Sequence, residues 1–104
     1  MSTFIMFGKY TSDGFNNMSQ ERTGKIVEII KKHNGEIHKM YAILGEYDLV
    51  FLVDFQNTKT AMQTSVEIAH YSGINFSTSP VLPVEMFDEL MGGGFFSDWE
   101  TPQS

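Results

Sequence analysis

Four neighbouring residues, Gly45-Glu46-Tyr47-Asp48, form a polar break between two apolar runs. A tyrosine beside an aspartate offers a hydrogen-bond donor and an acceptor, which suits the rim of a pocket for a small polar ligand. His38 lies in the run before the break and is the best general-base candidate, because histidine exchanges protons most readily near neutral pH. We therefore take His38, Tyr47 and Asp48 as candidate catalytic residues.

The polar break also has a purely structural interpretation. Gly45 can supply an unusual backbone angle, and Asp48 can accept a hydrogen bond from a turn amide. Tyr47 can pack its ring against the protein while its hydroxyl stays in water. The sequence leaves both interpretations of the break open.

Alternation along the run before the break places His38 on one face with three apolar residues. That position is typical of a hydrogen-bonded interior histidine, but it also allows a side chain that points into a cavity. The residues that share the predicted face are Met40, Ala42 and Leu44.

Metal and haem sites find little support in the sequence. His70 follows Glu67 by three positions, a spacing used in di-iron bundles, but both fall on the expected polar side of their helix. The further bridging carboxylates of such a site are absent. Haem held by one histidine, His38 or His70, is an alternative whose apolar pocket is equally explained as core. We therefore predict no metal and no cofactor.

Composition excludes several classes of protein. The chain has 104 residues and no cysteine, so disulfides, thiolate metal sites and cysteine nucleophiles are ruled out. Its formal charge of -6 argues against nucleic acid as the main partner, because phosphate binding needs a basic surface. No apolar run reaches the roughly 18–20 residues of a membrane span. The start lacks the features of a signal peptide, so we expect a cytoplasmic protein.

Two strands are predicted to be apolar on both faces. The first covers residues 3–10, and the second covers 49–55, where five consecutive residues are apolar. Such strands lie in the centre of a sheet and are covered on both sides. One face of the first strand carries Phe4, Met6, Gly8 and Tyr10, and the other carries Ile5, Phe7 and Lys9.

Two helices and two further strands complete the pattern. A helix is expected to start between residues 12 and 16 and to end near His33, with Asn34-Gly35 as a left-handed stop. A second helix should begin after an N-cap at Asn57 or Thr58 and end near residues 72–73. The predicted inward stripe of the first helix is Phe15, Met18, Arg22, Ile26, Ile29 and Ile30. That of the second is Ala61, Met62, Ser65, Val66 and Ala69.

The remaining strands are expected over residues 36–44 and within 74–84. Pro80 and Pro83 interrupt the latter, so it should lie at a sheet edge, and a short helical turn is expected over 84–91. The order is that of a ferredoxin-like α+β fold, βαββαβ, with an antiparallel four-stranded sheet and two helices on one face. The other face would be bare and apolar, so we expect two copies to pair into a dimeric α/β barrel.

A set of glycines and aromatic residues spread over residues 3–90 forms a recognisable pattern. Its members are Gly8-Lys9-Tyr10-Thr11, Gly14, Asn16 or Asn17, Gly35, Tyr41 and Leu44-Gly45-Glu46-Tyr47-Asp48. This pattern resembles the GYD family of small proteins. The resemblance implies a ferredoxin-like fold that forms a dimeric α/β barrel, and it implies no particular activity.

The C-terminal residues differ from the rest of the chain. We divide the protein into a GYD-type domain over 1–91 and a glycine-rich aromatic tail over 92–104. Three large aromatic residues within five positions are unusual for a solvated tail. We therefore expect Phe95, Phe96 and Trp99 to dock into a groove on a neighbouring subunit or on another protein.

The sequence as a whole favours a homodimer or higher homo-oligomer that binds a small ligand or a protein partner. The residues expected to bind the ligand are Tyr10, His38, Tyr41, Tyr47 and Asp48. One alternative is a cofactor-independent monooxygenase or isomerase in which His38, Tyr47 and Asp48 move protons. Others are a haem or metal binder and an assembly module built on the aromatic tail. Whether the protein is an enzyme stays open.

Overall fold

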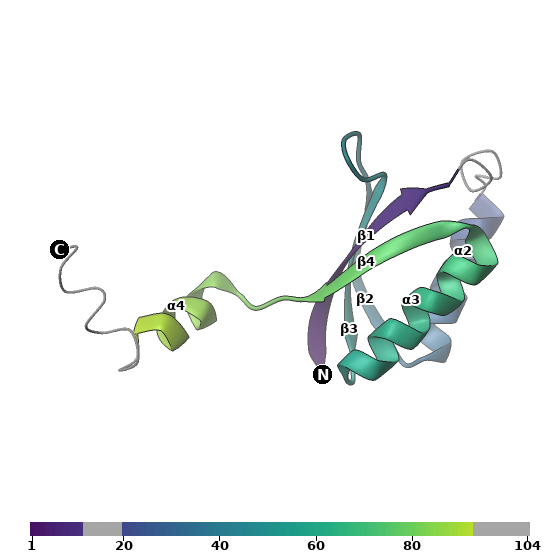
Figure 1. The fold of residues 1–104 in the computed structure, drawn as a ribbon. Coiled ribbons are helices and arrows are strands. Elements are labelled where there is room, and N and C mark those ends of the chain that lie inside the picture. The colour runs from purple at the N-terminus through teal and green to yellow at the C-terminus, as the bar shows by residue number, and fades with distance from the viewer. Residues whose placement is uncertain (12–19, 93–104) are drawn as a thin grey trace.

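The structure is a computed structural model that describes residues 1–11 and 20–92. The predicted order of strands and helices is confirmed, and a short helix follows the last strand (Figure 1). The elements are β1 (Ser2–Tyr10), α2 (Gln20–Lys32), β2 (Glu36–Ala42), β3 (Leu49–Phe55), α3 (Thr58–Ser72), β4 (Ile74–Pro80) and α4 (Val84–Gly92). The predicted start of the first helix, with Phe15 and Met18, lies outside the described residues.

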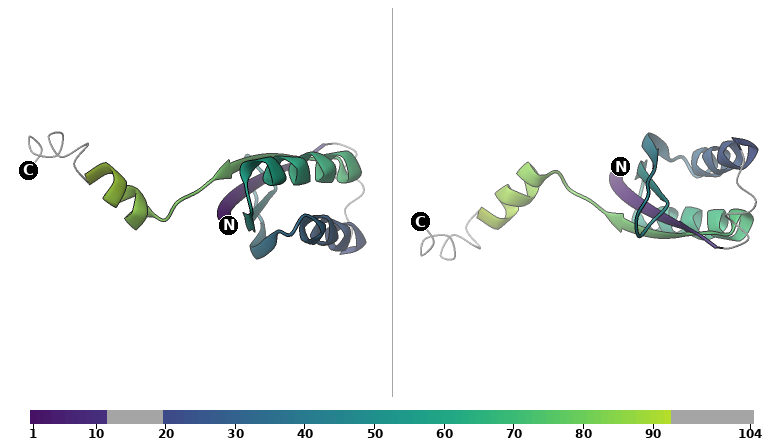
Figure 2. Two further views of the ribbon diagram at one scale, coloured as in Figure 1. Left: turned by 90° about the horizontal axis from the view of Figure 1, so that it is seen from below. Right: turned by 90° about the horizontal axis from the view of Figure 1, so that it is seen from above.

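The four strands form one antiparallel sheet in the order β2-β3-β1-β4. As predicted, β1 and β3 are the central pair and the proline-bearing β4 lies at an edge. Helices α2 and α3 lie side by side over one face of this sheet (Figure 2). This is the ferredoxin-like α+β fold that the sequence predicts.

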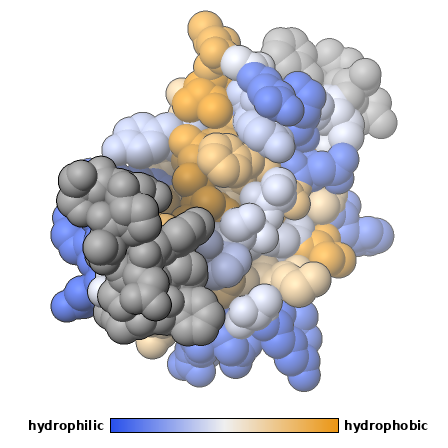
Figure 3. Space-filling view, turned by 60° about the vertical axis from the view of Figure 1, so that its left-hand side comes forward, coloured by the Kyte–Doolittle hydropathy of each residue, from blue (hydrophilic) through white to orange (hydrophobic). Residues whose placement is uncertain are grey.

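The other face of the sheet, the open face, has none of the helices of residues 20–92 over it. In β1, Phe4 and Met6 are buried on the helix side, whereas Ile5 and Phe7 are half-buried on the open side. Strand β3 alternates in the same way, since consecutive residues of a strand point to opposite faces. Figure 3 shows hydrophobic side chains gathered in a band that runs from the top of the view toward its middle.

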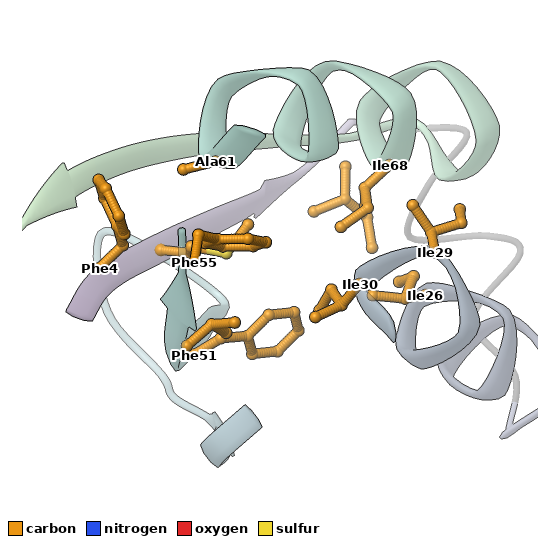
Figure 4. Close-up of a cluster of buried hydrophobic side chains, with 11 residues drawn as sticks. Phe4, Ile26, Ile29, Ile30, Phe51, Phe55, Ala61 and Ile68 are labelled. Carbon is orange, nitrogen blue, oxygen red and sulfur yellow. The ribbon is translucent and has the colours of Figure 1, made fainter. Parts of the chain in front are cut away.

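The core fills the space between the helix side of the sheet and the two helices (Figure 4). Phe4 and Phe55 meet edge to face with ring centroids 5.9 Å apart. Burying this many apolar side chains is the main favourable term in folding. The core residues are Phe4, Met6, Ile26, Ile29, Ile30, Phe51, Val53, Phe55, Ala61, Ile68 and Ile74.

Helix α3 has the predicted caps but not the predicted buried stripe. The Asn57 side chain accepts a hydrogen bond from the Thr60 amide, and Gly73 ends the helix in the left-handed region with φ of 73°. However, Met62 and Val66 are exposed, so the predicted inward placement of these two residues is wrong.

Small hydroxyl residues take the inward positions of α3 instead. Ser65 is buried because its hydroxyl reaches both the Ala61 carbonyl oxygen and the Thr78 hydroxyl, and the Ser72 hydroxyl donates to the Ile68 carbonyl. Thr64 donates to the Thr60 carbonyl in the same way. A hydroxyl satisfied within its own helix can be buried at little cost, and this lets α3 approach β4 closely.

Helix α4 stands apart from the rest of the fold (Figures 1 and 2). The Val81 amide still donates to the Thr3 carbonyl, and Pro83 then begins the first turn by accepting from the Phe87 amide. No residue of α4 is buried. Among the helices of residues 20–92, none has the length and apolar character that crossing a membrane requires.

Two glycines give a matched test of the packing. A Cβ added at Gly35 would lie 2.7 Å from Ile30 Cγ2 and 3.0 Å from the Ile30 carbonyl oxygen. We expect Gly35→Ala to lower the free energy of unfolding by about 1–3 kcal/mol. Gly24 is at an exposed position of α2, with nothing within 4 Å of an added Cβ. Gly24→Ala should therefore raise the free energy of unfolding by about 0.5–1 kcal/mol. Urea unfolding of both variants measures the two changes in stability. Equal changes would contradict the close packing at Gly35.

Candidate functional site

Backbone and side-chain hydrogen bonds join the loop over residues 43–48 to the end of β1. The Asp48 amide donates to the Gly8 carbonyl at 2.8 Å, and the Tyr10 amide donates to Asp48 Oδ2 at 2.9 Å. Lys9 Nζ donates to the Glu46 carbonyl at 2.8 Å. Lys9 and Tyr10 therefore lie beside this loop. Asp48 uses its carboxylate to hold a strand amide, as the structural interpretation expects.

Tyr47 extends the apolar surface of the open face. Its ring lies on that of Phe7, with centroids 5.0 Å apart. Phe7 is opposite Val50 in the β1–β3 ladder, and Ile5 is opposite Leu52, so the four side chains form one apolar strip across the two central strands. All four are half-buried. We refer to Ile5, Phe7, Val50 and Leu52 as the apolar strip.

His38 lies on the open face, and its predicted place on one face with Met40 is wrong. The pairing of β2 with β3 shifts between Ile37, opposite Val53, and Lys39, opposite Leu52. His38 is thus the extra residue of a β-bulge, which resets the alternation along β2. Met40 packs against the core, whereas the His38 side chain is 44% exposed.

The bulge brings His38 to a carboxylate that the sequence analysis did not single out. His38 Nε2 lies 2.8 Å from Asp54 Oδ2, and the Thr3 hydroxyl donates to Asp54 Oδ1 at 2.5 Å. Thr3 and Asp54 are opposite each other in the β1–β3 ladder. The sequence pointed to Asp54 only as an acidic residue near the end of the apolar run over 49–55. Its partner could not be predicted, because the contact with His38 depends on the bulge.

The Thr3 hydroxyl, and after it His38, hold the pKa of Asp54 below its ordinary value of 3.8. Both stabilise the charged carboxylate by hydrogen bonding. Asp54 therefore stays ionised to lower pH in the folded chain than in the unfolded chain. The cluster gives the open face a charged group at the end of the apolar strip opposite to Tyr47.

The three candidate catalytic residues do not meet in one protomer. Asp48 directly precedes β3, whereas the partner of His38 is Asp54 near the other end of that strand. Six residues of extended strand span roughly 20 Å. A general base at His38 therefore cannot share one bound molecule with Tyr47 and Asp48 within a single copy.

A pocket of about 180 Å³ lies on the helix side of the sheet and brings Tyr10 and Tyr41 together. Arg22, which is buried, also lines it, with its guanidinium carbon 5.4 Å from the centre of the Tyr10 ring. Arg22 was predicted only as part of an inward helix stripe. A charged residue in an otherwise apolar stripe was the sequence signal for this pocket.

The other two histidines lie on the helix layer. Glu67 of α3 accepts a hydrogen bond from Lys32 Nζ at 2.6 Å and lies 2.9 Å from His33 Nε2, so it joins α3 to the end of α2. Lys32, and then His33, lower the pKa of Glu67. His70 is exposed. Within residues 1–11 and 20–92, no group of three or more histidines and carboxylates could hold a metal ion.

Comparison with known proteins decides the family. The sequence profile of the GYD domain matches residues 4–91, which is most of the chain. The chain belongs to the GYD domain family. Its Gly45, Tyr47 and Asp48 form the loop that is anchored to β1.

One relative of this GYD protein has a descriptive name. It is a glutamine synthetase and cystathionine beta-lyase binding protein of Thermus thermophilus, 26% identical over 87 residues. The match covers 81% of the chain and 92% of the relative. The two proteins therefore correspond over nearly the whole of the described fold.

Solved structures share the fold at low identity. A feast or famine regulatory protein of Mycobacterium tuberculosis complexed with L-methionine has a TM-score of 0.60 at 12% identity, over 80% of this chain. The leucine response regulatory protein of the same organism has a TM-score of 0.53 at 11% identity, over 79%. The GYD chain spans about half of the length of each regulator, 51% in both cases. These likenesses support the fold alone.

The Asp54 cluster predicts a pH dependence. Because the pKa of Asp54 is lowered in the folded chain, the cluster stabilises the fold above the ordinary pKa, and this contribution is lost as the pH falls through the lowered value. We expect Thr3→Val to raise the pKa of Asp54 and to reduce stability at neutral pH. Carbon-13 NMR of the carboxyl groups measures the pKa directly. Val81, whose amide donates to the Thr3 carbonyl, should keep its amide shift, and an unchanged Asp54 pKa would contradict the assignment.

Proposed function

We propose that this GYD protein is a homodimeric protein-binding module that acts by holding partner enzymes and not by turning over a substrate. The observation that carries the proposal is the open face, where the apolar strip lies between polar clusters and none of the described helices covers it. A surface with an apolar centre and a polar rim is typical of a protein interface.

Pairing of two copies through the open face accounts for the strip. Ile5, Phe7, Val50 and Leu52 are each half-buried in one copy, and a second sheet packed face to face would bury them fully. The predicted dimeric α/β barrel has this arrangement. His38 and Asp54 would then lie at the border of the interface, where their polar atoms stay in contact with water.

A loop with a fully exposed leucine supports the binding of a further partner. Leu44 lies in the 43–48 loop, and it is fully exposed and separate from the core. The loop itself is held by Asp48 and Lys9, so the leucine is presented by a fixed backbone. Fixed loops on a strand scaffold are common binding sites, since little order has to be gained on binding.

The chemistry of the described residues gives catalysis less support. Asp48 and Asp54 accept hydrogen bonds from Tyr10 and Thr3, and these bonds hold strands together. The pocket with Tyr10, Arg22 and Tyr41 is smaller than the roughly 300 Å³ at which drug-sized ligand pockets begin. It suits at most a small anionic ligand, with Arg22 as the group that would meet the negative charge.

A charge in the apolar strip tests the dimer. In Leu52→Asp, pairing of two sheets would bury an unpaired carboxylate, and a cost of about 3 kcal/mol or more weakens the dimer at least ~100-fold. Gln56→Asp adds the same charge at an exposed position just beyond the end of β3 and outside the apolar strip, so it should leave the dimer intact. Sedimentation equilibrium measures both, with circular dichroism to confirm folding. A wild-type chain that sediments as a monomer would refute the dimer.

The partner enzymes named for the Thermus relative supply probes for the binding role. We expect the protein to bind glutamine synthetase or cystathionine beta-lyase of its own source organism, measured by calorimetry with the purified enzymes. Leu44→Asp should weaken that binding about tenfold or more while the dimer persists. Gln56→Asp again serves as the control. Failure to bind either enzyme would refute these two enzymes as partners. Binding that Leu44→Asp does not weaken would refute the part of the 43–48 loop in the contact.

A further inference from the structure

Helix α4 needs a surface to pack against. It has nine residues, and isolated helices shorter than about 12–15 residues are only marginally stable in water. Its apolar and acidic residues separate cleanly around the helix at 100° per residue. The apolar side carries Val84, Met86, Phe87, Leu90 and Met91, and the other side carries Glu85, Asp88 and Glu89.

The apolar side of α4 is exposed to water in a single copy. The side chains of Val84 and Leu90 are 69% and 62% exposed, and Met86 and Phe87 are about half exposed. The segment over 81–83 ends in proline and directs α4 away from α2 and α3 (Figure 2). The helix therefore lies outside the packed core of its own chain.

A surface of matching character lies on the helix layer, between α2 and the outward side of α3. An open surface on α3 alone runs along Met62 and Val66, the two residues whose exposure the sequence did not predict. Beside it, a hollow of about 580 Å³ lies between α2 and α3, and the two surfaces share Glu67 and His70. We call the two together the helical groove.

The length of the helical groove fits α4. The apolar residues that line it on α3 run from Met62 to Tyr71, which are nine residues apart, or about 14 Å at 1.5 Å per residue. Helix α4 has nine residues and the same length. Apolar side chains at both ends and in the middle of the groove would meet apolar side chains along the whole of α4.

Charge also favours this pairing. Four lysines and two glutamates line the helical groove, which gives it a formal charge of +2 in a chain whose total is -6. Helix α4 carries three carboxylates and no basic residue. The groove thus holds most of the lysines of the protein and is the surface most suited to an acidic amphipathic helix. The lysines are Lys25, Lys31, Lys32 and Lys59.

We propose that α4 of one copy docks in the helical groove of a second copy. The contact uses surfaces other than the open face, so it does not depend on the sheet-to-sheet dimer. It places α4 on the outside of the helix layer, where burial of Phe87 and Leu90 against Met62 and Val66 supplies the apolar contact. The acidic side of α4 then points away from the floor of the groove, and the long side chains of the lysines at its borders reach toward it.

The absence of cysteine from the chain allows a clean cross-linking test. Met86→Cys places a thiol on the apolar side of α4, and Gln63→Cys places one in the groove. An equimolar mixture of the two single variants, oxidised mildly, should form mixed disulfide dimers several times faster than a mixture of Asp88→Cys with Gln63→Cys. Asp88 is on the opposite side of the same helix, so it controls for exposure and mobility. Raised salt should slow the reaction, because it screens the lysine–carboxylate attraction.

Three results would overturn the proposal. Equal rates for Met86→Cys and Asp88→Cys would show that α4 has no fixed place in the groove. A double variant, Met86→Cys with Gln63→Cys, that closes only into a monomeric ring would show that α4 docks on its own chain. No cross-link in any mixture would show that α4 does not dock in the helical groove and would point to a different protein as its partner. Adding Leu52→Asp to both single variants tests the docking without the sheet-to-sheet dimer, so a failure of one contact can be told from a failure of the other.

Discussion

The two central strands are apolar on both faces of the sheet, but helices α2 and α3 cover only one of these faces. On the helix side, the side chains of Phe4, Met6 and Phe55 are buried by α2 and α3. On the open side, Ile5 and Leu52 remain half-buried. This imbalance follows from the two right-handed crossovers of the fold, which bring both helices to the same face. The exposed apolar surface of the sheet follows from it, because no helix of residues 20–92 covers the second face.

Polar residues sit at both ends of the open face and hold strands in register. Asp48 binds the Tyr10 amide at one end, and Asp54 binds Thr3 and His38 at the other. The apolar strip lies between these clusters. The residues that first suggested proton chemistry thus lie at the two ends of this strip.

Much of the fold was predictable because it depends on local features of the chain. The alternation of β1 and β3, the cap at Asn57 and the edge position of β4 with Pro80 all follow from residue type and spacing. The wrong prediction for α3 concerned which residues face the core. From hydropathy we expected Met62 in the interior, whereas Thr64 is buried there, because its hydroxyl is satisfied by a hydrogen bond inside its own helix.

The sequence by itself determined the order of elements, the two faces of the central strands and the resemblance to the GYD family. Tertiary structure alone decided which polar groups meet. The bulge at His38 arises from pairing between β2 and β3, and it turns His38 toward Asp54 and away from the core. The separation of His38 from Asp48 is likewise set by the length of β3. Contacts of this kind depend on register between segments distant in sequence, and periodicity within one segment carries no information about that register.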